Sequence, residues 1–89
     1  MRAVITVIGC DKVGIIAGVT AELAADNINI VNISQALMND LFTMIMMVDM
    51  SGCTRPFAEV SDGLKARGLE MGVEIRIQKE EIFNSMHRI

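Results

Sequence analysis

The residues best placed to do chemistry form a short glycine-containing segment between an apolar run and a helix-like run. Residues 9–16 are Gly-Cys-Asp-Lys-Val-Gly-Ile-Ile, and they follow the strand-like run 3–8. A strand that turns through glycines straight into a helix presents free backbone N–H groups and the positive end of a helix dipole, which suits a small anion. This arrangement predicts binding, and it needs no catalytic side chain.

Two nucleotide-binding motifs share features with this segment, and both fail. Gly9 and Gly14 have the spacing of a P-loop, but Ile15 and Ile16 stand where a lysine and a hydroxyl residue should follow. The dinucleotide fingerprint fails as well, because Gly9, Gly14 and Gly18 have the wrong intervals. The segment therefore predicts a loop that holds a carboxylate without nucleotide chemistry.

The elements that must position this loop follow from hydrophobic periodicity and turn residues. We expect strand, helix, strand, strand, helix, strand and a tail helix, at 3–8, 15–25, 28–38, 41–50, about 56–71, 73–78 and about 79–89. The apolar stripe of the first helix is expected to contain Ile16, Val19 and Leu23. A phase slip after Ile30 suggests a bulge, and the two residues Asn39-Asp40 predict a hairpin turn.

The ends of the helices have their own signals. Asp11 is a candidate cap for the first helix, and Thr54 or Ser51 for the second. Gly72 stands just past the end of the second helix, and Gly68 looks like a weak point within it.

This order predicts a single α+β domain over residues 1–89, a ferredoxin-like βαββαβ sandwich with a short C-terminal helix. Right-handed crossovers place both helices on one face of a four-stranded antiparallel sheet. We expect the first and third strands to lie side by side and parallel in the centre. The face that the helices leave open, with a column of Met and Ile side chains, predicts self-association into a homodimer.

Composition narrows the classes of partner. The formal charge is -3, there is no Trp or Tyr, and no basic stripe is present, so nucleic-acid binding is disfavoured. The N-terminal apolar run is too short for a membrane span or a signal peptide, which favours a cytoplasmic protein with no membrane partner. Cys10 and Cys53 do not make a disulfide framework. With the loops after the first and third strands at the same edge of the sheet, the two cysteines could be neighbours. Two inert thiols are the favoured interpretation, and a thiol switch or part of a metal site are the alternatives.

The residues at 11–17 and 27–30, Asp-Lys-Val-Gly-Ile-Ile-Ala and Asn-Ile-Asn-Ile, resemble the motif of the ACT domain, a small-molecule sensing module with this fold. The stretches 73–83 and 86–89 are similar to the ends of stand-alone ACT-domain proteins of the UPF0237 type. The resemblance covers essentially the whole chain. One departure is Val13, where many ACT domains carry a proline.

The resemblance implies a ligand site for an amino acid or related carboxylate between two copies of the domain. The residues carried over from the loop and from the second strand are Asp11, Lys12, Val13, Gly14, Ile15, Ile16, Asn29, Ile30 and Asn32. In this site Gly14 allows close backbone approach, the N–H groups near Ile15 and Ile16 donate hydrogen bonds to the carboxylate, and Asn29 or Asn32 fixes the amino group.

Purely structural roles compete with these. Asp11 can act as a helix cap, Lys12 as a solvated side chain, and Asn29 as a turn residue. No nucleophile with a base and no pair of converging carboxylates emerges, so we expect no enzyme activity and no metal or other cofactor. His87 stands alone on the tail. The alternative function is a ligand-free regulatory adaptor that docks on a regulated partner protein through the apolar sheet face or the C-terminal helix.

Overall fold

A computed structural model of the chain describes residues 1–10 and 14–86. Its elements are β1 (Arg2–Cys10), α1 (Ile15–Ala25), β2 (Asn29–Met38), β3 (Leu41–Asp49), α2 (Phe57–Met71), β4 (Val73–Lys79) and α3 (Glu80–Met86). The expected order of strands and helices is confirmed. The candidate residues Asp11, Lys12 and Val13, together with His87, lie outside the described residues.

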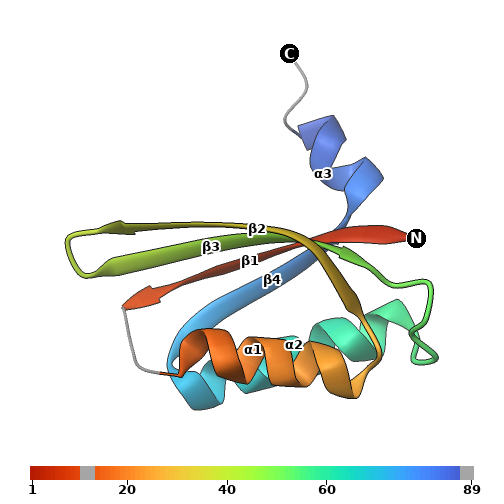
Figure 1. Ribbon diagram of the computed structural model, residues 1–89, viewed down its shortest axis with the longest axis horizontal. Coiled ribbons are helices and arrows are strands. Elements are labelled where there is room, and N and C mark those ends of the chain that lie inside the picture. Colours follow the sequence, from red (N-terminus) through yellow and green to blue (C-terminus); the bar gives the residue numbers. More distant parts are fainter. Residues whose placement is uncertain (11–13, 87–89) are drawn as a thin grey trace.

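The four strands form one antiparallel sheet in the order β2-β3-β1-β4. Helices α1 and α2 cover one face of it, and the short α3 stands on the other side (Figure 1). An ion pair between Arg2 Nε and Glu80 Oε2, at 3.3 Å, ties α3 to the start of β1. The ferredoxin-like βαββαβ sandwich is therefore confirmed, with a tail helix on the face that α1 and α2 leave open.

One expectation about the centre of the sheet was wrong. Strands β1 and β3 are neighbours but antiparallel, with Arg2 opposite Asp49 and Cys10 opposite Leu41. The physical reason is the hairpin, which reverses β3 against β2, while the crossover through α1 makes β2 run the same way as β1. The loops after β1 and β3 consequently leave the sheet at opposite ends. Cys10 and Cys53 are both free thiols and are not neighbours.

The two ends of the sheet carry different connections. The hairpin end holds Gly14, the turn Asn39-Asp40 and Gly72, where α2 passes into β4. The tail end holds the start of β2, the β3–α2 loop (50–56) and α3. Asn39 has a φ of 55°, and the register of β2 shifts between Ile30 and Asn32, so the predicted turn and bulge are confirmed.

The core lies between the sheet and the two long helices. Its fully buried members include Ile5, Val7, Val19, Leu23, Met44, Met46, Val48, Val60 and Leu64. The methionine column of β3 is therefore covered by helices, whereas Leu41 and Ile45 point to the open face. In α1 the predicted burial of Val19 and Leu23 is confirmed, but the first member of the apolar stripe is Ile15, and Ile16 is exposed.

Of the two predicted caps of helix α2, the one at its start is wrong and the one at its end is correct. Pro56 occupies the N-cap without a side-chain hydrogen bond. The expected cap by Thr54 or Ser51 is wrong, because the Ser51 hydroxyl and N–H both donate to Asp49 instead. The other end is as expected, since Gly72 closes the helix in the left-handed conformation with φ 74°. Gly68 is buried, and a Cβ there would lie 2.7 Å from the Val73 carbonyl oxygen.

Candidate functional site

The site is built first on Gly14, which occupies the N-cap of α1. Its φ of 90° lies in the left-handed region, and a Cβ built on it would meet nothing within 4 Å. Glycine is thus required by the backbone conformation rather than by lack of space. Its carbonyl oxygen accepts the first helical hydrogen bond from the Gly18 N–H, at 2.8 Å.

The start of α1 leaves backbone donors available. No side chain among the described residues caps the helix at Gly14, and the first turn contains no acidic residue. As the first residues of the helix, Ile15, Ile16 and Ala17 have N–H groups without a helical acceptor, and these N–H groups form the positive end of the helix dipole. This part of the predicted site can donate backbone hydrogen bonds to a carboxylate.

The residues predicted from the second strand lie far from that helix start. Asn29 pairs with Asp49, which is opposite Arg2, so Asn29 is at the tail end of the sheet. Gly14 follows Cys10 at the hairpin end, and the nine residues of β1 span about 27 Å between the two ends. Within one chain the structure does not bring the two halves of the candidate site together.

Asn32 and Ile30 lie on different faces of β2. Asn32 pairs with Met47, which belongs to the open face of the sheet, while Ile30 is opposite the buried Val48 and packs against the core. Of the two asparagines, Asn29 is nearer to the turn after α1, where the strand bends toward the helix layer (Figure 1).

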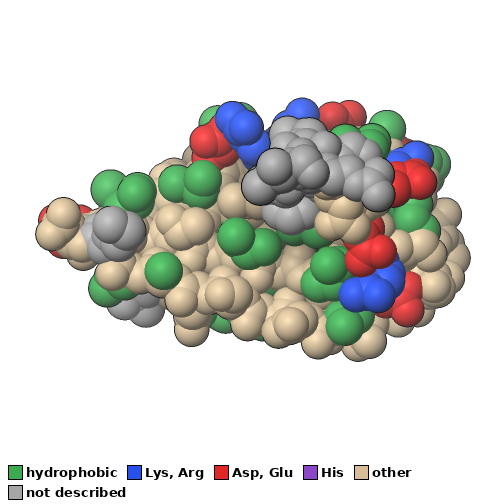
Figure 2. Space-filling model, turned by 90° about the horizontal axis from the view of Figure 1, so that it is seen from above, with side chains coloured by type: hydrophobic (Ala, Val, Ile, Leu, Met, Phe, Trp, Pro, Cys, Tyr) green, Lys and Arg blue, Asp and Glu red, His purple; other side chains and the backbone are tan. Residues whose placement is uncertain are grey.

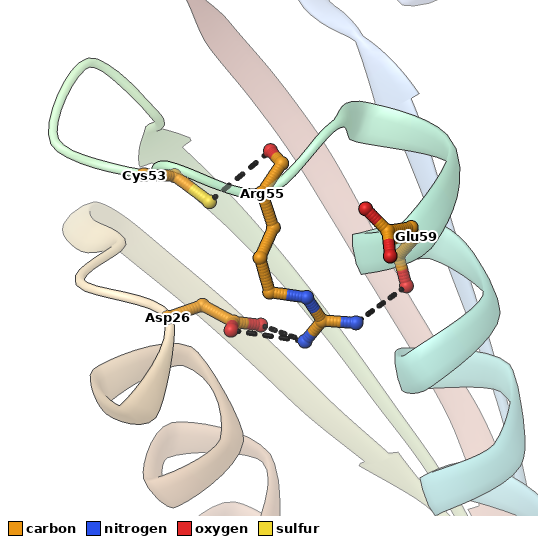
Figure 3. Close-up of polar contacts among 4 residues, drawn as sticks. All are labelled: Asp26, Cys53, Arg55 and Glu59. Atoms are coloured by element: carbon orange, nitrogen blue, oxygen red, sulfur yellow. Dashed lines mark hydrogen bonds and ion pairs between the residues drawn. The ribbon is translucent and has the colours of Figure 1, made fainter.

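The sequence analysis missed a hydrogen-bonded cluster of Asp26, Arg55 and Glu59 near the start of β2, called the clasp below. Arg55 Nη1 donates to both carboxylate oxygens of Asp26, at 3.0 and 3.1 Å, and Arg55 Nη2 donates to the carbonyl oxygen of Glu59 (Figure 3). Hydrogen bonds and charge from Asp26 raise the pKa of the Arg55 guanidinium above its ordinary value. Beside this clasp, the Asn27 amide donates to the Gly52 carbonyl at 3.0 Å.

The clasp fixes the turn from which Asn29 emerges. It joins the end of α1 to the loop before α2, two segments that are 29 residues apart in sequence. The local sequence indicated only that a helix ends before Asn27, which has a positive φ of 56°. No spacing rule pairs Asp26 with Arg55, so sequence alone could not have found the contact.

The outer edge of β2 is apolar on the side of the helices. Ile33 and Leu37 are opposite the buried Met46 and Phe42, so their side chains point to the helix face, yet both are exposed. Ile16 is exposed on the flank of α1 away from α2, since Gly18 on the other flank faces Met71. A strand edge without a neighbour thus runs beside an uncovered apolar strip.

The open face of the sheet is more mixed. Figure 2 shows hydrophobic side chains in separate groups there, with charged side chains gathered toward the end that carries α3. In the described part of the chain no three His, Cys, Asp or Glu side chains come together as metal ligands would. None of the described helices is long and apolar enough to cross a membrane.

The fold and the glycine-started helix define a class of small regulatory domain, and comparison with known families identifies it. The profile of the ACT domain family matches residues 2–78, so the chain belongs to the ACT domain family. ACT domains are regulatory and often bind amino acids. The family assignment confirms the resemblance stated from the sequence motifs.

Two similar proteins align with this chain over almost their whole length. The UPF0237 protein of Listeria innocua is 56% identical over 100% of both chains. A solved ACT domain protein from Streptococcus pneumoniae superposes with a TM-score of 0.83, at 40% identity over 93% of both chains. The regulatory subunit of aspartate kinase from Thermus thermophilus has a TM-score of 0.67 at 26% identity, covering 86% of this chain and 50% of that one.

Proposed function

We propose that this protein is a non-enzymatic regulatory module that binds an amino acid or a related carboxylate as a homodimer. The observation that carries the proposal is the start of α1, where Gly14 holds a left-handed conformation and no side chain of the described residues caps the N–H groups that follow. Membership of a regulatory family, and the likeness to the regulatory subunit of an amino-acid kinase, support the same conclusion.

The dimer follows from the separation of the two halves of the site. If the β2 edges of two copies pair antiparallel about a twofold axis, the hairpin end of one copy lies beside the tail end of the other. Gly14 of one subunit then approaches Asn29 of the second, and the ligand bridges them. The exposed side chains of Ile16, Ile33 and Leu37 would be buried by the same contact.

A cytoplasmic location is part of this proposal. Cys10 and Cys53 are free and lie at opposite ends of the sheet, which is the thiol usage typical of a reducing compartment.

Calorimetric titration with a panel of amino acids tests ligand binding. We expect at least one to bind wild type, and we expect Gly14→Leu to abolish that binding while the domain stays folded, because the position has space and only the φ is unfavourable. Gly63→Ala, in the middle of α2, is the matched control and should bind normally. Flat heats for every amino acid with a folded wild-type dimer would refute the proposal.

Sedimentation velocity tests the interface separately. Ile33→Arg places a charge in the proposed contact and should yield monomers that no longer bind the ligand. A variant that stays dimeric would exclude the β2 edge as the interface. Monomers that still bind would exclude the bridging role of the second subunit.

A further inference from the structure

The second edge of the sheet is formed by β4 and differs from the β2 edge. Among the described residues, strand β4 pairs with β1 alone, from Val73 opposite Gly9 to Lys79 opposite Ala3, without any shift in register. From Val73 to Ile77 no described strand lies beside its outer backbone N–H and C=O groups. Natural sheets usually protect such an edge with a bulge, a proline or an inward-pointing charge, and β4 has none of these from Val73 to Ile77. Lys79, at the end of the strand, lies over the ring of Phe57 in α2.

A groove of about 780 Å³ runs along this edge, between β4 and the outer flank of α2. The helix contributes Ser61, Lys65 and Leu69, and the strand contributes residues 73–78. Leu69 is 84% exposed, the largest exposed fraction among the large hydrophobic side chains that the structure describes. An apolar side chain this uncovered, at one end of a groove, marks a place where a partner side chain can pack.

The groove contains a positively charged side chain without an acidic partner among the described residues. Every other Lys or Arg side chain that the structure describes has a partner in an ion pair or over an aromatic ring. Lys65 alone among these cations has none, and it stands midway along the groove wall. An acidic side chain in the groove would complement it.

The spacing of the helix residues matches that of a strand. Ser61, Lys65 and Leu69 are four residues apart, which is about 6 Å along a helix. Alternate residues of a strand are about 6.8 Å apart. The helix-facing side chains of one added strand would therefore meet Ser61, Lys65 and Leu69 in turn.

We propose that the groove binds an extended segment of a partner protein, which adds to the sheet as a strand antiparallel to β4. The segment has the pattern polar-x-acidic-x-apolar, in which the polar residue meets Ser61, the acidic residue meets Lys65, and a Leu or Ile packs on Leu69. Backbone pairing with β4 supplies the affinity, and these three contacts supply the register. The surface lies on the edge opposite β2, so it stays accessible in the proposed ligand-binding dimer.

A capped heptapeptide with the core Thr-Thr-Glu-Thr-Leu is the probe, titrated into full-length protein and followed by amide chemical shifts. We expect shifts in β4 and around Lys65 and Leu69. Lys65→Glu should weaken binding about tenfold and should bind the peptide with a central Lys better than wild type does. Ala24→Glu adds a negative charge on the exposed side of α1 and should leave the affinity unchanged.

Backbone pairing is tested by N-methylation of the peptide. Methyl groups on one set of alternate amides should abolish binding, because those N–H groups face β4, and methyl groups on the other set should have little effect. Equal effects of both sets would overturn strand addition. Shifts confined to the β2 edge or to Gly14, or no shifts up to about 1 mM peptide, would also overturn it. So would a sedimentation shift showing that a second copy of the chain occupies the groove.

Discussion

The two edges of the sheet differ in how the helices support them. On β4 the helix-facing isoleucine, Ile75, is 2% exposed because α2 packs directly beneath it. On β2 the corresponding Ile33 is 42% exposed, because no helix lies under that part of the strand. The β2 edge is also bulged between Ile30 and Asn32, whereas the pairing of β4 is regular.

The two edges therefore offer different contacts to a partner. The helix-facing side chains of β4 are buried, so a partner at this edge meets backbone groups and the groove that β4 forms with α2. The β2 edge leaves apolar side chains uncovered, which another subunit can bury. Substitutions at β4 are therefore expected to act mainly on folding, and substitutions at β2 mainly on association.

The largest expected effect comes from truncating the two isoleucines. Ile75→Ala should lower the free energy of unfolding by about 3 kcal/mol, because it leaves a cavity between α2 and the sheet. Ile33→Ala should lower it by less than about 1 kcal/mol in the monomer, since the side chain is already solvated there. Urea denaturation followed by circular dichroism gives both values. Equal losses at low protein concentration would contradict the contrast between the edges.

A smaller effect is expected at the contact between α2 and β4. Gly68→Ala should destabilise the domain by about 1–3 kcal/mol, because the new Cβ would meet the Val73 carbonyl oxygen and force the helix from the strand. The control is Gly63→Ala in the same helix, where the nearest atoms are 3.6 Å away in the flexible side chain of Glu22. That variant should gain up to about 1 kcal/mol from helix propensity. If urea denaturation shows that Gly68→Ala lowers the free energy of unfolding and Gly63→Ala raises it, packing requires a glycine at position 68.

Local patterns predicted most of the fold. The alternation along β3, the turn at Asn39 and the helix end at Gly72 each depend on residues close in sequence, and each was correct. In α1 Val19 and Leu23 were correct, but Ile16 was predicted in place of Ile15, because the two are equally apolar and only the packing on the sheet decides which is buried. Ser51 was a candidate helix cap, but its N–H and hydroxyl donate to Asp49, two residues earlier, in a local Asx turn that the sequence analysis overlooked.

The candidate site was predictable only in its first half. The glycines around Cys10 indicated a helix start, and the structure has one at Gly14, with no side-chain cap from the described residues. The position of Asn29 depends on the direction of β2 relative to β1, and the clasp between Asp26 and Arg55 on a contact between distant segments. Both are properties of the assembled sheet, so no spacing within the sequence contains them.

The smallest expected effect concerns the strand end beside the start of β2. The Ser51 hydroxyl, at 2.6 Å, and the Ser51 N–H, at 2.9 Å, donate to Asp49 and lower the pKa of its carboxyl below the ordinary value of 3.8. A lowered pKa stabilises the fold above the unfolded-state pKa, and this contribution is lost as the pH falls through the folded-state value. Asp49→Asn should therefore be slightly less stable than wild type near neutral pH and should approach it in acid. Urea midpoints at about pH 7 and about pH 2.5 measure the change. The control is Asp40→Asn at the hairpin turn, where the carboxylate has no partner among the described residues. Its stability should differ from wild type by the same small amount at both pH values. A loss of stability in Asp49→Asn that does not depend on pH would exclude the carboxylate as the cause.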